Sequence, residues 1–213
     1  MGYKVKEIYY TLQGEGLNSG RAAVFLRFTG CNLWSGREED RPKGRGGCAL
    51  WCDTDFVGTD GPLGGHYDTP QDLAARVRSL WPENQGHPLV VCTGGEPLLQ
   101  LDPPLIEALH GVGLAVAIET NGTLPVPEGV DWVCLSPKAH APLVVDKGDE
   151  LKLIYPQEFL APEDFLHLDF KAFLLQPLDG PKVKDHTQQV LEYCLAHPQW
   201  RVSLQTHKLL QIR

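Results

Sequence analysis

Three cysteines lie in a stretch of the chain that is rich in Gly, Pro and charged residues. Cys31, Cys48 and Cys52 are spaced as Cys-x16-Cys-x3-Cys. Three thiolates can hold an iron–sulfur cluster and leave one iron without a protein ligand, and that iron can bind a substrate or cofactor directly. The spacing alone also permits three unrelated thiols, or a zinc site completed by a fourth ligand such as His66 or Asp53.

The remaining cysteines and the histidines do not suggest a second site. Cys92, Cys134 and Cys194 lie inside apolar patterns, where a free thiol usually serves as a small core residue. The eight histidines are scattered, and no two have the i, i+4 spacing of metal ligands on one helix. The chain carries no nucleophile-elbow, Walker or Rossmann fingerprint.

Two turns that contain glycine could let a ligand approach the backbone closely. The first is QGEG at residues 13–16, in which two glycines surround a carboxylate, and we expect it to precede the first strand. The second is TGGEP at residues 93–97, which follows an apolar run; its Glu96 could pair with an ammonium group. Each turn taken alone is also explained as an ordinary turn between two elements.

Arg27 and the segment CDTD at residues 52–55 add charge and oxygen ligands. Arg27 lies in the apolar run RAAVFLRF, and a buried guanidinium needs an anion. That anion is either a bound carboxylate, held by two hydrogen bonds, or a nearby Asp or Glu. The oxygen atoms of CDTD suit Mg²⁺, and a turn closed by an Asp side chain is the alternative.

Short apolar runs that alternate with helical patterns must position these residues. The expected strands cover residues 21–28, 88–93, 114–119, 132–135, 151–154 and 172–175. We expect one helix that starts at Pro70, with Thr69 as its N-cap. Three further helices are expected at residues 103–110, 162–167 and 185–197. This alternation predicts an α/β fold with a parallel sheet, in which functional residues follow the carboxyl ends of the strands.

Composition excludes several classes of protein. The chain has 213 residues and a net charge of −8, which argues against a nucleic-acid partner. No apolar run reaches the roughly 18 residues of a membrane span, and the N-terminus lacks the apolar core of a signal peptide. We therefore expect one cytoplasmic domain whose cysteines stay reduced. The 22 Gly and 17 Pro predict many loops and no long helices.

Seven short motifs, in order over nearly the whole chain, carry a family resemblance. They are YYTLQGEG (9–16), VFLRFTGCNL (24–33), WCDTD (51–55), TGGEP (93–97), ETNG (119–122), SPK (136–138) and QPLD (176–179). Any one of them is weak, but the ordered set is specific. It resembles the radical S-adenosylmethionine superfamily and, within it, the 7-carboxy-7-deazaguanine synthase family.

The resemblance implies an incomplete β/α barrel of about six strands. A single domain, residues 1–213, would form it, with the cluster-binding loop at about residues 31–68. Cys31, Cys48 and Cys52 would hold a [4Fe–4S] cluster. The superfamily usually spaces these cysteines as Cys-x3-Cys-x2-Cys, and this family tolerates a longer first interval. The second interval here is one residue longer than expected, and Gly46 and Gly47 supply backbone freedom before Cys48.

The resemblance also implies the residues that bind the other ligands. Magnesium would be bound by Thr54. S-adenosylmethionine would be bound by Gly95, Ser136, Pro137, Lys138, Gln176, Pro177, Leu178 and Asp179. The pterin substrate would be bound by Leu12, Gln13, Gly14, Arg27, Thr93 and the C-terminal Arg213.

The implied activity is that of a carbon–nitrogen lyase in queuosine biosynthesis. One electron from the cluster would cleave S-adenosylmethionine to a 5′-deoxyadenosyl radical. That radical would convert 6-carboxy-5,6,7,8-tetrahydropterin to 7-carboxy-7-deazaguanine, with loss of ammonia. The family implies a homodimer and a flavodoxin or ferredoxin as reductant. One alternative is another radical S-adenosylmethionine enzyme, such as an activating enzyme for a glycyl radical protein, which the QGEG turn and Arg27 argue against. The second alternative is a zinc-binding module.

Overall fold

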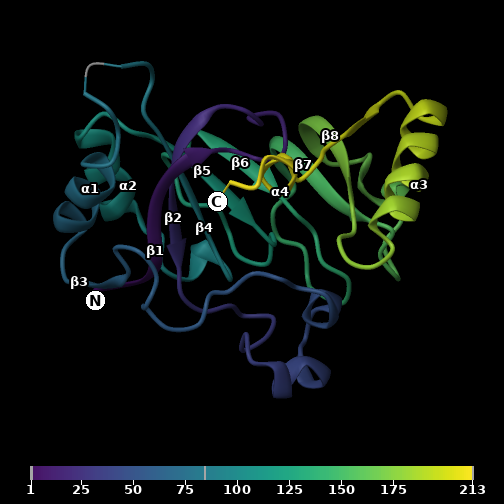
Figure 1. The fold of residues 1–213 in the computed structure, drawn as a ribbon, viewed down its shortest axis with the longest axis horizontal. Coiled ribbons are helices and arrows are strands. Elements are labelled where there is room, and N and C mark those ends of the chain that lie inside the picture. Colours follow the sequence, from purple (N-terminus) through teal and green to yellow (C-terminus); the bar gives the residue numbers. More distant parts are fainter. Residues whose placement is uncertain (1, 84, 213) are drawn as a thin grey trace.

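The computed structural model describes residues 2–83 and 85–212 and contains one nine-stranded sheet (Figure 1). The strand order is β3-β1-β2-β4-β5-β6-β7-β8-β9. Its strands are β1 (Tyr3–Leu12), β2 (Ala22–Phe28), β3 (Gly65–Tyr67), β4 (Leu89–Gly94), β5 (Ala115–Thr120), β6 (Trp132–Leu135), β7 (Lys147–Tyr155), β8 (Asp169–Pro177) and β9 (Trp200–Val202). β2 and β4 to β9 run parallel, whereas β1 and β3 are antiparallel to their neighbours.

The six expected strands are all present, as β2, β4, β5, β6, β7 and β8. The expected number of about six is nevertheless too low, because β1, β3 and β9 extend the sheet at its two edges. β1 was hidden because Lys6 and Glu7 interrupt its apolar alternation, where the register with β2 shifts between Val5 and Glu7. The QGEG turn therefore connects β1 to β2 rather than preceding the first strand.

Most of the helices also agree with expectation. α1 (Pro70–Arg78) begins at Thr69, whose side chain accepts a hydrogen bond from the amide of Asp72. α2 (Pro103–Gly111) and α3 (Val183–Ala196) match the other two long patterns. The segment expected as a helix at 162–167 is a shorter 3₁₀ turn, η4 (Pro162–Phe165), and α4 (Thr206–Leu210) was not expected.

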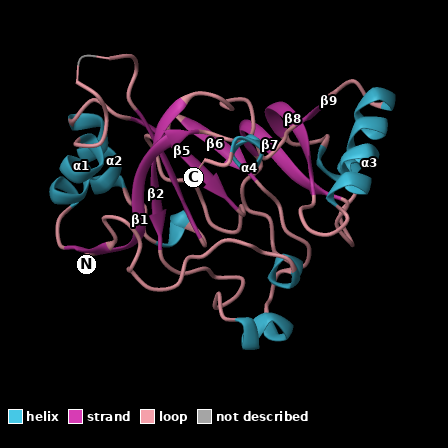
Figure 2. Ribbon diagram, viewed as in Figure 1, coloured by secondary structure: helices cyan, strands magenta, loops and turns pink. Residues whose placement is uncertain are grey.

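Two apolar clusters hold the sheet and its helices together. The larger cluster packs β1, β2, β4 and β5 against α1 and α2, and the smaller one packs β6 to β8 against α3. Figure 2 shows α1 and α2 at one end of the sheet and α3 at the other. The long segment between β2 and β3 projects from the sheet and carries two 3₁₀ turns, η1 (Glu38–Lys43) and η2 (Gly47–Leu50).

The connections after β5 and β6 contain no helix among the described residues, which agrees with the high content of Gly and Pro. The carboxyl ends of the parallel strands share one edge of the sheet, where these loops, the segment after β2 and the C-terminal residues meet. In the described part of the chain, no helix has the length and apolar character needed to cross a membrane.

Candidate active site

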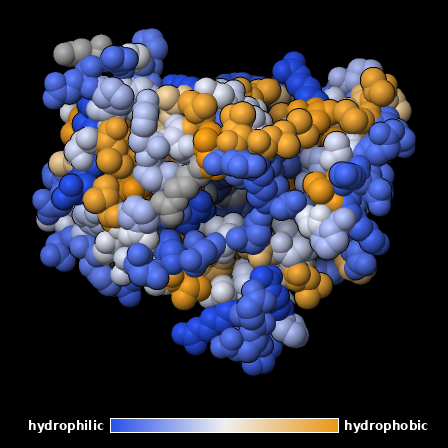
Figure 3. Space-filling model, viewed as in Figure 1, coloured by the Kyte–Doolittle hydropathy of each residue, from blue (hydrophilic) through white to orange (hydrophobic). Residues whose placement is uncertain are grey.

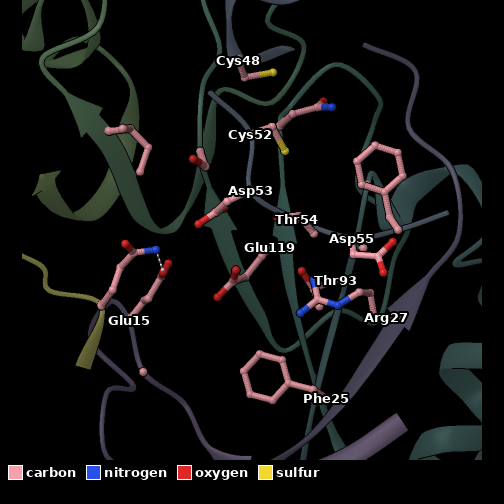
Figure 4. Close-up of a pocket in the computed structure, with 18 of the residues that line it drawn as sticks. Glu15, Phe25, Arg27, Cys48, Cys52, Asp53, Thr54, Asp55, Thr93 and Glu119 are labelled. Carbon is pink, nitrogen blue, oxygen red and sulfur yellow. Dashed lines mark hydrogen bonds between the residues drawn. The ribbon is translucent and has the colours of Figure 1, made fainter. Parts of the chain in front are cut away.

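A cavity of about 450 Å³ lies at the carboxyl ends of the parallel strands. Its volume is in the range of small-molecule sites. Arg27 and Thr93, which are register partners on β2 and β4, line one side of it. In Figure 4, the sulfur atoms of Cys48 and Cys52 lie at one end of the cavity and the ring of Phe25 lies at the other.

The cavity brings together most of the residues that the sequence suggested. Its lining contains Leu12, Gln13, Gly14, Arg27, Cys31, Cys48, Cys52, Thr54, Thr93, Gly95, Ser136, Lys138 and Gln176. Pro137, Pro177, Leu178 and Asp179 adjoin this set in the chain but do not line the cavity. Arg213 lies outside the described residues.

The unusual interval between Cys48 and Cys52 forms one closed helical turn. The amide of Cys52 donates to the carbonyl of Cys48 at 2.7 Å, and the amide of Trp51 donates to the same carbonyl at 3.0 Å. Residues four apart lie on the same face of such a turn. The extra residue therefore allows both thiols to face the same cavity, which explains how the chain accommodates the longer spacing.

Cys31 reaches the cavity from the loop that follows β2. Its sulfur accepts a hydrogen bond from the amide of Leu33 at 3.4 Å. A methyl group added at Gly95 would lie 2.2 Å from the carbonyl oxygen of Gly30 and 2.7 Å from the Cβ of Cys31. Gly95 is thus needed for close contact between the TGGEP turn and the loop that carries Cys31.

The surroundings of the three thiols suit an iron–sulfur cluster. Trp34, Ala49 and Phe56 form a small apolar cluster against which Cys31 and Cys52 pack. Burial raises the pKa of the Cys48 thiol to about 11, and the ammonium of Lys138 acts against this rise. A coordinated metal deprotonates such thiols outright. Three soft ligands in an apolar setting beside one cation therefore fit the group.

A zinc site is not formed by these residues. Within residues 2–83 and 85–212, no three Cys, His, Asp or Glu side chains lie close enough together to hold a single metal ion. His66, one proposed fourth ligand, lies on β3 and does not line the cavity. The described residues therefore offer no ready-made set of ligands for the zinc ion that the cysteine spacing also permitted.

Arg27 has a protein partner in addition to its place in the cavity wall. Its Nε donates to Oε1 of Glu7 at 2.9 Å, and its Nη2 donates to the hydroxyl of Tyr9 at 3.2 Å. The ion pair expected as the alternative to a bound carboxylate is therefore present. These contacts involve two of the five N–H donors of a guanidinium, so the ion pair does not exclude a bound carboxylate.

Glu96, which the sequence suggested as a partner for an ammonium group, is engaged in contacts within the protein. Its side chain is fully buried and accepts hydrogen bonds from the hydroxyl of Thr120 at 2.8 Å and the amides of Asn121 at 2.8 Å and Leu98 at 3.0 Å. Burial raises the pKa of this carboxyl, and these donors oppose the rise. Glu96 instead ties the TGGEP turn to the ETNG turn on the neighbouring strand.

Thr54 lies in the cavity between two acidic residues that are engaged elsewhere. Asp53 pairs with Lys208 at 2.7 Å, and Asp55 pairs with the buried Lys6 at 2.8 Å. Asp55 also accepts from the amide of Val57 at 3.2 Å, which is the turn expected as the alternative to a magnesium site. Thr54 therefore lies on a loop that is held in place by ion pairs of the residues on either side of it.

A buried ion pair that no sequence motif indicates lies at the floor of the cavity. The ammonium of Lys152 contacts the carboxylate of Glu15 and lies 3.6 Å from Glu119. Gln13 donates to Glu119 at 2.8 Å, and Gln205 donates to Glu15 at 3.0 Å. Burial alone would raise the pKa of Glu15, but Lys152 lowers it to about 2. The signal available was a lysine inside the apolar run LKLI.

The C-terminal segment covers one side of the cavity. Gln205, His207, Lys208 and Ile212 line it. The amide of Thr206 donates to the carbonyl of Gly14 at 2.9 Å, which docks α4 on the QGEG turn. The sequence offered no sign of this, because α4 has five residues and none of them is buried.

Known proteins resemble this chain over its whole length. It is 58% identical over 212 residues to the 7-carboxy-7-deazaguanine synthase of Burkholderia multivorans, which covers 100% of both chains. It is 59% identical over 210 residues to the enzyme of that name from Caulobacter vibrioides, which covers 99% of each. The crystal structure of QueE from Escherichia coli superimposes with a TM-score of 0.71 at 28% identity, covering 97% of this chain and 95% of that chain.

No protein-family model matches the chain. The relatives nevertheless match it from end to end at more than half of its positions. Their agreement extends to the fold, which is a mixed α/β structure similar to that of QueE. The chain therefore belongs to the 7-carboxy-7-deazaguanine synthase family.

Proposed function

We propose that the protein converts 6-carboxy-5,6,7,8-tetrahydropterin to 7-carboxy-7-deazaguanine, with loss of ammonia, as a radical S-adenosylmethionine enzyme of queuosine biosynthesis. One observation carries the proposal: the three thiols of Cys31, Cys48 and Cys52 line the same cavity as Arg27, which can bind a carboxylate. The full-length identity to synthases of that name supports the substrate.

The cofactors in this proposal are a [4Fe–4S] cluster held by Cys31, Cys48 and Cys52, S-adenosylmethionine and Mg²⁺. When bound together, the cluster and S-adenosylmethionine would supply a 5′-deoxyadenosyl radical. Gly95 is proposed to contact S-adenosylmethionine, and its missing side chain lets the turn pack directly against the loop that carries Cys31. The other residues proposed to hold S-adenosylmethionine are Ser136, Pro137, Lys138, Gln176, Pro177, Leu178 and Asp179.

Substrate recognition combines one positive and several polar groups. Arg27 would hold the substrate carboxylate, and Mg²⁺ on Thr54 would bind the same group. Leu12, Gln13 and Gly14 would contact the pterin ring together with Thr93. Arg213 completes the proposed set.

Glu15, Glu119 and Lys152 would serve the same substrate at the floor of the cavity. A pterin ring presents N–H donors along one edge, and the two carboxylates, which both lie near Lys152, can accept from them. The apolar ring of Phe25 lies near this floor and offers a face for the flat ring. The protein thus orients the ring and keeps water from the reacting carbon.

The wider setting of the enzyme is also part of the proposal. The whole chain would act as one radical S-adenosylmethionine domain, a partial β/α barrel with its cluster-binding loop at about residues 31–68. A cytoplasmic location suits thiols that must be reduced to bind iron. A flavodoxin or ferredoxin would supply the electron.

A homodimer would cover part of the apolar surface. Leu195, Leu209 and Leu210 have 83%, 71% and 56% of their surface exposed. Figure 3 shows apolar side chains, in orange, along the edge of this face above α4 and toward α3. Apolar surface of this kind marks interaction sites, which supports a second copy of the chain as the partner.

Anaerobic reconstitution followed by product analysis tests the activity. The protein is supplied with iron, sulfide and a reductant, and then with S-adenosylmethionine and the tetrahydropterin. We expect brown protein with about four irons per chain, and formation of 7-carboxy-7-deazaguanine by mass spectrometry. Colourless protein that takes up zinc instead would refute the proposal. A cluster that cleaves S-adenosylmethionine but never yields this product would point to another superfamily member.

A further inference from the structure

The 16 residues between Cys31 and Cys48 form a folded unit rather than an open spacer. The amide of Arg45 donates to the carbonyl of Leu33 at 2.7 Å and closes the unit on itself. The amide of Gly47 donates to the carbonyl of Ala139 at 2.8 Å and attaches it to the loop after β6. A methyl group at Gly44 would lie 2.2 Å from the Cβ of Ala49, so the two 3₁₀ turns pack tightly against each other.

Arg41 lies at the centre of this unit and spans it. Its Nη1 donates to the carbonyl of Ala49 at 2.7 Å, and its Nη2 donates to the carbonyl of Cys52 at 3.1 Å. The carboxylate of Glu38 accepts from Nε at 2.6 Å and from Nη2 at 2.7 Å. The guanidinium lies 4.6 Å from the ring centre of Trp34, where cation and aromatic face attract.

These contacts connect Arg41 to the backbone and the apolar neighbours of the three cysteines. Ala49 and Cys52 belong to the helical turn that also carries Cys48, so the two carbonyl contacts hold both ends of that turn. Trp34, on which Arg41 lies, packs with Ala49 and Phe56 against Cys31 and Cys52. A guanidinium satisfies these contacts at once because its donors are fixed in one plane.

We propose that Arg41 is a positioning residue for the iron–sulfur cluster: its guanidinium braces the loop so that Cys48 and Cys52 face the cavity before the cluster binds. The inference rests on the proposed function, because it assumes that the loop held by Arg41 binds an iron–sulfur cluster. Lysine, with a single ammonium, cannot make the same set of contacts. The planar, forked arrangement of the N–H donors on the guanidinium, here called the fork, is therefore the property that matters, rather than the positive charge.

Cluster retention tests this proposal. Arg41→Gln removes the fork and the charge, Arg41→Lys keeps the charge, and Arg45→Gln is the control, since Arg45 is an exposed residue of the same loop. After anaerobic reconstitution, we expect both Arg41 variants to lose iron to a chelator about ten-fold faster than the wild type, as is typical for residues that orient metal ligands. The control should match the wild type. If Arg41→Lys retained its iron as well as the wild type does, the role of the fork would be overturned.

A second measurement uses the metal-free protein and does not depend on the cluster. Trypsin does not cleave the Arg41–Pro42 bond, so the substitutions leave the number of sites at that position unchanged. The Lys43–Gly44 bond is present in every variant. We expect it to be cut several-fold faster in Arg41→Gln than in the wild type, because both proteins keep the neighbouring Arg45–Gly46 bond and differ only at position 41. Equal rates would refute the brace. A wild-type protein that takes up no cluster would instead refute the proposed function. The rate at which trypsin cuts the Lys43–Gly44 bond would still test whether Arg41 holds the loop.

Discussion

The cavity has two halves that the chain builds in different ways. On one half, Arg27, Thr93 and Glu119 are fixed on neighbouring parallel strands whose other side chains form the larger apolar cluster. On the other half, Cys48 and Cys52 are carried by a loop of 3₁₀ turns, held by polar contacts to Arg41 and a small apolar cluster.

The difference shows how stability is distributed in the site. The strand half is stabilised by buried apolar area, which does not depend on any ligand. The loop half depends on hydrogen bonds and ion pairs, whose net contributions are small, so a ligand that binds there adds much of its stability. The residues proposed to bind the substrate thus stand on a rigid wall, whereas the proposed cluster would stabilise the loop that binds it.

The largest expected effect comes from removing a thiol from the loop half. Cys31→Ala should abolish cluster assembly and turnover, because two thiolates and an open position do not retain the cluster. Cys194→Ala is the matched control, since Cys194 lies on α3 away from the cavity. Iron and sulfide content, together with product yield, measure both. A full, active cluster in Cys31→Ala, or likewise in Cys48→Ala, would show that the ligand set is different.

The next effect is expected on the strand half, at Arg27. Arg27→Lys keeps the charge beside Glu7 but loses the two-pronged contact with a carboxylate. We expect the KM for the carboxylated pterin to rise about ten- to hundred-fold, the value of one or two hydrogen bonds to a charged group. Reductive cleavage of S-adenosylmethionine should continue. A pterin lacking the carboxyl group should bind wild type and variant equally, and a difference that persists would contradict the role.

The buried ion pair at the cavity floor should make stability depend on pH. The pKa of Glu15 falls from 4.5 in the unfolded chain to about 2 in the folded protein. Its contribution is therefore complete above pH 4.5 and is lost as the pH falls toward 2. The shift corresponds to about 3 kcal/mol. Urea unfolding of Glu15→Gln and wild type should differ by about this much at pH 6, and the difference should shrink at pH 3. A difference that stays constant would exclude the ion pair as the cause.

The smallest effect is expected where the C-terminal segment meets the loop half. Lys208 bridges Asp53 and Asp179, and all three side chains are partly exposed. Exposed pairs contribute about 0.2–1 kcal/mol each, so Lys208→Met should weaken the docking of α4 only several-fold. Hydrogen exchange at residues 204–212 should become faster, whereas Lys184→Met on α3 should leave it unchanged. Unchanged exchange in Lys208→Met would show that the bridge does not hold the segment.

Much of the strand half could be predicted from the sequence. Apolar runs ended by Gly, Thr or Pro identify β2, β4, β5 and β6, because strands buried on both faces carry few polar residues. β7 was expected only at residues 151–154, since Asp149 and Glu150 appear too polar for a buried strand. Both carboxylates are buried with partners: Asp149 accepts from the amide of Val133 at 2.8 Å, and Glu150 accepts from Leu17 at 2.6 Å.

The loop half could be predicted only as a set of residue types. The cysteines and CDTD were identified from their spacing and from a family resemblance, whereas their geometry depends on contacts between residues far apart in the chain. The contact of Lys208 with Asp53 joins residues 155 positions apart. Local sequence preferences carry no information about such a pairing, and the same applies to the docking of α4 on Gly14.

The contact between Gly95 and the loop of Cys31 has a consequence for protein engineering. Because the two backbones touch where Gly95 has no side chain, a larger residue there would displace a cluster ligand as well as the turn proposed to hold S-adenosylmethionine. The two proposed cofactor sites therefore share one tight backbone contact. Redesign of either one, for a different sulfonium or a different metal centre, has to be carried out on both together.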